Sequence, residues 1–174
     1  MPGSPAHLFS RFFDVASARA LTSSERSAVS SWLDPELGEL FFHQGDADQR
    51  HGYHSALHVI AAGEGKSDVI QAALLHDVGK RHAGLGVVGR SLASLLILFR
   101  RPLSQSMRAY RDHGLMAARE LGARGAPSLA IDFAMHHHGD RPPTIDPETW
   151  VLLVAADEPP KTLSSLRVRI TSGP

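Results

Sequence analysis

The segment QAALLHDVGKRH, residues 71–82, carries an ionisable pair in a stretch that is otherwise largely apolar at its start. On an α-helix, residues three, four and seven positions apart lie on the same side, so Asp77 would share a face with Ile70 and Leu74. A carboxylate that is buried without a partner costs several kcal/mol. The segment therefore predicts either that a cation lies beside Asp77 or that the helix does not extend that far.

Composition narrows the classes of protein that this chain can belong to. With 174 residues, 43% hydrophobic and 21% charged, it can bury a sizeable core, and we expect a single domain. Lys+Arg and Asp+Glu both number 18, so the chain lacks the positive charge of a protein that binds nucleic acid or an anionic membrane. The absence of cysteine excludes disulfides, thiolate metal ligands and cysteine nucleophiles. We therefore expect a small-molecule partner, with no nucleic acid and no membrane.

The longest apolar run, residues 92–99, is far shorter than the roughly 20 residues that span a bilayer. The N-terminus lacks the basic-then-apolar order of a secretory signal, so we place the protein in the cytoplasm. The apolar run could form the face of a homodimer, but packing in the core is the favoured interpretation.

Helix signals dominate and strand signals are scarce, which predicts an all-α bundle of about six or seven helices. Asp34-Pro35 and Asp146-Pro147 each combine a capping residue with a proline suited to a first helical turn. Thr22 or Ser23 is expected to cap another helix. Further helices are predicted over residues 10–20, 48–62, 87–100, 105–121 and 127–138, and one that contains the opening segment is predicted to begin at Ser67 or Asp68 and to stop at Gly79.

A polar residue on an apolar helix face needs a partner, and three of the predicted helices carry such a residue. His113 shares a face with Leu121, and Asp157 shares one with Leu153. Together with Asp77, these residues would bring two carboxylates and an imidazole into the core. A helical bundle can satisfy such groups with a metal ion, because imidazole nitrogen and carboxylate oxygen suit iron, manganese, zinc, cobalt or magnesium. The alternatives are salt bridges to arginine for the aspartates and a hydrogen-bonded core histidine for His113.

His76-Asp77 lies within AALLHDVGK, with a histidine-bearing helix predicted before it and an aspartate after a later apolar run. These motifs resemble the HD-domain superfamily of metal-dependent phosphohydrolases. RDHGLMAARELGA is similar to the family's His-x-x-x-Gly/Ala-x-x-Leu segment, and AMHHHGD is similar to its Ile-x-x-His-His segment. The similarity is greatest to short bacterial members. It covers about residues 48–158, the expected HD core. Separately, the sequence predicts N-terminal helices over 1–47 that pack on the bundle and a partly disordered tail over 159–174.

The resemblance implies a set of metal ligands. His76, Asp77 and Asp157 match without ambiguity, whereas the first histidine is either His51, which is favoured, or His54. Consecutive helical residues are rotated by about 100°, so the triplet 136–138 cannot direct all three rings to one ion. The family pattern favours His137, followed by His138, and His113 would join them. Asp77 would then bridge two divalent transition-metal ions, with iron, manganese, cobalt, nickel or zinc as candidates and magnesium possible.

The activity implied is hydrolysis of a phosphate ester or anhydride in a small phosphorylated compound, with a nucleotide favoured, by metal-activated water. Asp77 and Lys80 would be catalytic, and Lys80 and Arg50 would bind phosphate. Two other functions stay open: the protein could be a di-iron oxygenase of the HD fold or a non-catalytic HD module that senses ligands. His58 and His82 are expected to be surface or packing residues.

Overall fold

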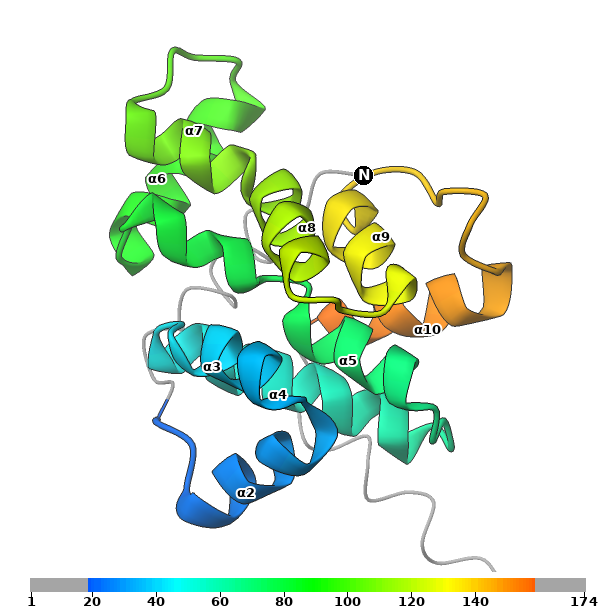
Figure 1. Ribbon diagram of the computed structural model, residues 1–174. Coiled ribbons are helices and arrows are strands. Elements are labelled where there is room, and N and C mark those ends of the chain that lie inside the picture. The colour runs from blue at the N-terminus through cyan, green and yellow to red at the C-terminus, as the bar shows by residue number, and fades with distance from the viewer. Residues whose placement is uncertain (1–18, 159–174) are drawn as a thin grey trace, which may run out of the picture.

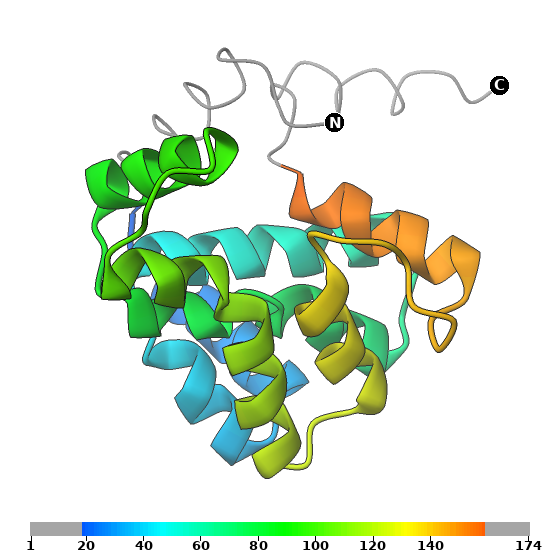
Figure 2. The same ribbon diagram turned by 90° about the horizontal axis from the view of Figure 1, so that it is seen from above.

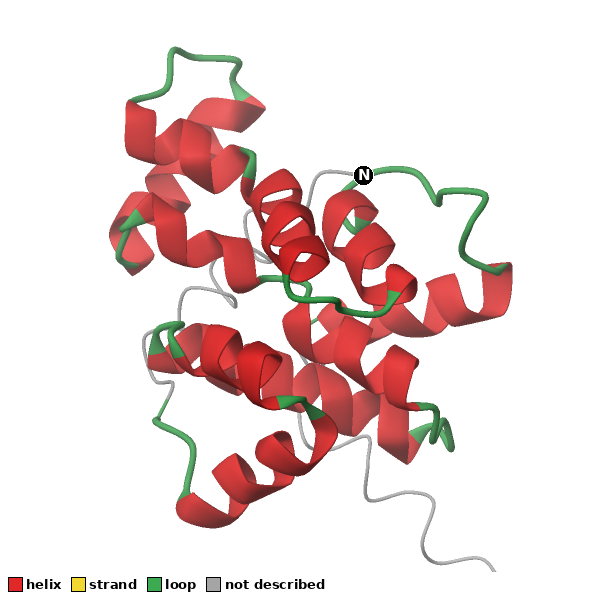
Figure 3. Ribbon diagram, viewed as in Figure 1, coloured by secondary structure: helices red, strands yellow, loops and turns green. Residues whose placement is uncertain are grey.

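The computed structural model describes residues 19–158, and this part of the chain folds into nine α-helices and one 3₁₀ helix, with no strand (Figures 1 and 3). The predicted all-α class is confirmed, with more helices than the six or seven expected. The helix predicted over 10–20 falls almost wholly outside the described residues, as does the tail over 159–174. The elements are α2 (Ser23–Trp32), α3 (Pro35–Phe42), α4 (Asp46–Ala61), α5 (Ser67–Leu75), η1 (Val78–Ala83), α6 (Val87–Leu98), α7 (Gln105–Arg111), α8 (His113–Ala123), α9 (Ser128–His136) and α10 (Pro147–Asp157).

Local sequence accounts for the starts of α2 and α10. The Thr22 hydroxyl accepts a hydrogen bond from the Glu25 amide, and the Glu25 carboxylate accepts one from the Thr22 amide, which forms a capping box. At α10, the Asp146 carboxylate accepts a hydrogen bond of 2.9 Å from the Thr149 amide, and a proline follows in the first turn. Both predicted helix starts are confirmed.

Helix α5 differs from the prediction at both ends. Its N-cap is Lys66, so the prediction of a polar cap one or two residues later is wrong. The α-helix ends at Leu75, and His76 occupies the C-cap position. Asp77 follows with φ −102° and ψ 4°, outside the α-helical region, and the chain continues through Gly79 as η1. The carboxylate is therefore buried although it does not belong to the helix, and the prediction of a stop at Gly79 is wrong.

The helix predicted over 105–121 is two helices in the structure. The helix is interrupted at Asp112, which lies between α7 and α8. Its φ of −95° and ψ of 15° place it outside the α-helical region. An apolar pattern with the same period continues across the break, so periodicity alone does not show it. His113 is consequently the first residue of α8 rather than a residue in the middle of a longer helix.

Helix α5 forms the centre of the core, between α4 and α9 (Figure 1). Every one of its residues from 69 to 75 is buried. Helix α10 packs against both α4 and α5, and α4 and α10 lie side by side in the view from above (Figure 2). Val29 of α2 and Phe41 of α3 are fully buried in the same hydrophobic core. The ends of α5, α8, α9 and α10 thus come close together.

Helix α6 packs mainly against α7 at one edge of the bundle, at the upper left of Figure 1. Leu92, Leu95 and Leu98 are 46%, 43% and 47% exposed, and Phe99 is 65% exposed. The expectation that residues 92–99 pack in the core is therefore wrong for most of the run, and only Ala93 within it is buried. Within residues 19–158, no helix has the length and hydrophobicity needed to cross a membrane.

Candidate metal centre

Two groups of histidine and aspartate side chains come together from α4, α8 and α10 and from the residues that follow α5 and α9. In each group, one potential ligand atom per residue lies within 4.8 Å of those of all the other members. We call them the first and second ligand groups. The first comprises His51, His76, Asp77 and Asp157, and the second comprises Asp77, His113, His137 and His138.

Asp77 belongs to both groups, and its two carboxylate oxygens face in different directions. Oδ2 lies 3.5 Å from Nε2 of His76 and 3.6 Å from Nε2 of His51. Oδ1 lies 3.3 Å from Nε2 of His113 and 3.5 Å from Nε2 of His137. The side chain is only 3% exposed. One buried carboxylate therefore connects the two groups, which is the arrangement expected of a bridging ligand.

Backbone carbonyls fix the orientation of three of the rings. Nδ1 of His76, His113 and His137 lies 2.8, 2.6 and 2.8 Å, respectively, from the carbonyl oxygen three residues earlier in the chain. Because a carbonyl oxygen can only accept, Nδ1 is the donor in each bond. In the neutral ring, Nε2 then carries a lone pair directed into the cluster. This is the orientation that metal-ligating histidines adopt when a carbonyl holds the other nitrogen.

The ring nitrogens and carboxylate oxygens of the cluster are short of hydrogen-bond donors. Nε2 of His51 lies 3.3 Å from Nε2 of His76, and Nε2 of His113 lies 3.4 Å from Nε2 of His137. The Asp77 Oδ1 atom is buried without a hydrogen-bond partner. Ring nitrogens and carboxylate oxygens that lie this close in a buried site need a proton or a metal cation between them. The donor set of imidazole nitrogens and carboxylate oxygens is one that divalent transition metals accept, so the residues fit a metal centre.

The charged residues of the first ligand group shift one another's pKa values. Burial by itself lowers the pKa of His76, but Asp77 and Asp157 outweigh it and raise that pKa to about 10. Burial would raise the pKa of each aspartate, yet both lie well below the usual value, chiefly because of Lys80 and His76 beside Asp77, and of His76 beside Asp157. The cluster thus retains a proton at neutral pH, and a bound metal ion would replace it.

The second ligand group differs from the first in its access to solvent. His113 and His137 are buried, whereas His138 is an exposed residue. Its ring is tilted by 44° relative to that of His137, with centroids 3.9 Å apart. Partial burial of this ring by its neighbours, together with the charges of His137 and His113, lowers the pKa of His138 to about 3. The ring is therefore neutral at physiological pH. A hollow of about 240 Å³ opens beside this group and is also lined by Leu115 and Met135.

Three glycines allow the elements that carry the ligands to approach each other, and sequence reasoning did not identify this role. A Cβ atom on Gly52 or Gly114 would lie 2.6 Å from a carbonyl oxygen of α5 or α9, respectively. On Gly79 it would lie 2.0 Å from the carbonyl oxygen of His113. A signal was available in the sequence. Each glycine lies within two residues of a candidate ligand, in helical segments where glycine costs roughly 0.5–1 kcal/mol relative to alanine.

The two residues predicted to bind phosphate occupy different environments. Lys80 is 6% exposed, and its ammonium group contacts Oδ2 of Asp77. Arg50 forms a salt bridge of 2.5 Å with Glu25 and donates to backbone carbonyls at the start of the described chain. The structure thus brings Lys80 to the ligand groups and holds Arg50 against α2. Their roles in binding substrate stay predictions.

The other histidines of residues 19–158 lie outside both groups. The first ligand group contains His51 rather than His54, and the second contains His137 and His138 but not His136. His58 is exposed on α4, and Nε2 of His82 lies 3.0 Å from the Glu120 carboxylate. The expectation that these last two are surface or packing residues agrees with their positions.

Comparisons of this chain with protein-family models, with curated proteins and with solved structures find no match. The case for a metal centre therefore rests on the geometry of the two ligand groups. The resemblance to the HD-domain superfamily rests on the sequence motifs.

Proposed function

We propose that the protein is a metal-dependent phosphohydrolase of the HD type, acting on a phosphate ester or anhydride of a small phosphorylated compound, with a nucleotide favoured. The observation that carries the proposal is the buried Asp77 carboxylate, each oxygen of which faces one pair of histidines. The ions of two-metal hydrolases lie about 3.5–4 Å apart, a separation that one shared carboxylate can bridge.

Each ligand group would hold one divalent ion. When bound, such ions lower the pKa of a coordinated water to near neutrality and neutralise charge on the phosphoryl oxygens. The protein's own contribution is to fix the ligands in advance. The carbonyl partners of His76, His113 and His137 hold the rings in the tautomer that presents Nε2. Asp77 stays ionised beside Lys80 and His76, so it is ready to bind two cations.

Lys80 and the hollow beside the second ligand group would position the substrate. The Lys80 ammonium group lies at the Asp77 carboxylate and would meet a phosphate as a point charge. Leu115 and Met135 line the hollow with apolar surface that suits the organic part of the compound. His138, exposed at the same place, is the ligand with the best access to solvent.

The donor set of the two ligand groups also suits a second candidate function, oxygen activation by iron. Five histidines and two aspartates form a donor set that suits iron as well as zinc, manganese or cobalt. A di-iron oxygenase would use the same residues. A non-catalytic sensing module is the weaker alternative, because both ligand groups are intact.

The test is a screen of the purified protein, supplemented with each candidate metal, against phosphomonoesters, nucleotides, dinucleoside polyphosphates and cyclic dinucleotides. Asp77→Asn keeps the shape of the side chain but removes its charge. We expect it to reduce phosphate release by more than the roughly 10- to 100-fold that loss of an outer-shell partner costs. Asp132→Asn, on α9 and outside both groups, is the matched control and should leave turnover unchanged.

Two results would contradict the proposal. One is normal turnover by Asp77→Asn at the metal content of the wild type. The other is oxygen-dependent turnover with bound iron and no phosphate release from any compound, which would favour the oxygenase.

A further inference from the structure

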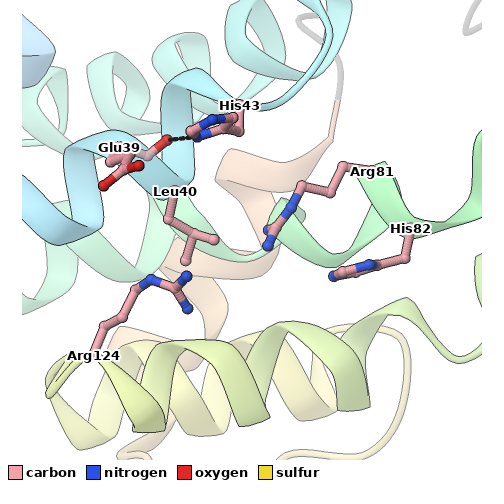
Figure 4. Close-up of a pocket in the computed structure, with 6 residues that line it drawn as sticks. All are labelled: Glu39, Leu40, His43, Arg81, His82 and Arg124. Atoms are coloured by element: carbon pink, nitrogen blue, oxygen red, sulfur yellow. Dashed lines mark hydrogen bonds between the residues drawn. The ribbon is translucent and has the colours of Figure 1, made fainter.

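A second hollow, of about 460 Å³, lies between α3, η1 and α8 (Figure 4). None of the residues that line it belongs to either ligand group. Its size falls in the range of roughly 300–1,000 Å³ that is typical of small-molecule sites. The lining residues are Glu39, Leu40, His43, Arg81, His82 and Arg124.

Arg81 is held in a fixed orientation on one wall of the hollow. Its Nη1 donates to the Val78 carbonyl at 3.1 Å, and its Nη2 donates to the Glu120 carboxylate at 2.5 Å. The side chain is 19% exposed. Two of its hydrogen bonds are thus made before any ligand arrives, so little conformational entropy would be lost when the guanidinium meets an anion.

Arg124, the C-cap residue of α8, lies on the facing wall. Its guanidinium points into the hollow toward Leu40 and Arg81 (Figure 4). Within residues 19–158, the side chain makes one hydrogen bond, from Nη1 to the Glu120 carbonyl at 3.2 Å, and has no carboxylate oxygen within 4.0 Å. Most of its donors are therefore directed to the hollow without a counter-charge.

Glu120 compensates the charge of Arg81, so, among the described residues, the positive charge without a paired carboxylate at the hollow is that of Arg124. Glu120 directs one oxygen, Oε1, to both Arg81 and His82. Glu39 is exposed, and its carboxylate points away from Arg81 and His82 in Figure 4. Its backbone carbonyl accepts from Nδ1 of His43 at 2.8 Å, which fixes that ring at the rim of the hollow.

We propose that this hollow is a second binding site, for a small phosphorylated compound, separate from the metal centre. Arg81 and Arg124 present two planar guanidinium groups, the donors best suited to paired hydrogen bonds with phosphate oxygens. Leu40 is buried at the base of the hollow and offers an apolar contact for the organic part. The site requires neither a metal ion nor hydrolytic activity, so it stands whether or not the proposed function does.

Pyrophosphate is a suitable probe, titrated into the full-length protein as purified while amide chemical shifts and binding heat are measured. We expect saturable shifts at Leu40, His43 and Arg124. Arg124→Gln should weaken this binding at least about 10-fold, because it removes charge-assisted hydrogen bonds. The matched control is Arg119→Gln, an exposed residue of the same helix outside the hollow, which should bind as the wild type does.

A repeat with Asp77→Asn separates the two sites. Shifts at the hollow should persist in that variant, because the metal centre does not contribute to them. The proposal would be overturned by unchanged affinity in Arg124→Gln, by equal weakening in Arg119→Gln, or by shifts confined to residues of the ligand groups. The amide spectrum of each variant also shows whether it is folded, so loss of binding and loss of structure are distinguished.

Discussion

Replacement of Gly79 by alanine tests whether close backbone packing sets the geometry of the second ligand group. The new Cβ atom would lie 2.0 Å from the His113 carbonyl oxygen and 2.8 Å from the Ala117 amide nitrogen. Both are backbone atoms, so no side chain can rotate away to make room. The first separation must grow from 2.0 Å to about 3.4 Å before the contact becomes ordinary. Helix α8 and η1 must therefore move apart.

The displacement is large compared with what a metal site tolerates. Ligand distances hold within about 0.2 Å, whereas the required movement exceeds 1 Å. His113 is the first residue of α8, and its Nε2 lies 3.3 Å from Oδ1 of Asp77, so the movement separates these two ligands. We expect Gly79→Ala to lose one ion per chain. Overpacking of this kind costs about 1–3 kcal/mol, and each kcal/mol lowers the melting temperature by about 2–4 °C in a chain of this size.

Elemental analysis and thermal unfolding measure both effects. Gly38→Ala is the control, because Gly38 also lies in a helix but a Cβ atom added there would have no other atom within 4 Å. It should keep both ions and melt no lower than the wild type, since alanine is the better helix former. If Gly79→Ala binds as many ions as the wild type with the same affinity, the packing of η1 on α8 does not control the site.

Two further predictions concern the metal content and the acid stability. His113→Ala should lose one of two ions and most activity, because it removes a ligand of the second group only. The control, His58→Ala on the exposed face of α4, should keep both ions. Elemental analysis that finds one ion in the wild type would contradict this prediction. Hydrogen bonds from Arg50 and then Thr22 lower the pKa of Glu25 from 4.5 to about 2, so the stability this carboxylate contributes is complete above pH 4.5 and is lost as the pH falls toward 2. The melting temperature of the wild type should therefore exceed that of Glu25→Gln by a constant difference above pH 4.5, and this difference should disappear toward pH 2. A difference in melting temperature that does not depend on pH would rule out a stabilising role of the Glu25 charge.

The sequence by itself determined which residues needed partners. Apolar neighbours at helical spacing marked Asp77, His113 and Asp157 as polar groups directed toward the core. Capping chemistry located the starts of α2 and α10, because a cap is made by side chains and amides within three residues of each other. These properties are local, so they can be predicted from residues that are close together in the sequence.

The tertiary structure decided which of the candidate residues meet. His51 and His54 share a helix face, but the packing of α4 against α5 and α10 brings only His51 to the first ligand group. His137 and His138 follow His136, the last residue of α9, and the packing of α9 against α8 brings both of them to the second ligand group. Helical periodicity cannot show where a helix ends against its neighbours.

The exposure of α6, the break at Asp112 and the hollow between α3, η1 and α8 depend in the same way on how whole helices pack. Arg81 and Arg124 are 43 positions apart in the chain and carry no motif that connects them. Their guanidinium groups face one hollow because η1 and α8 pack closely, with Gly79 against the His113 backbone. Distances between elements are set by the contacts of many side chains at once, and a single sequence does not reveal them.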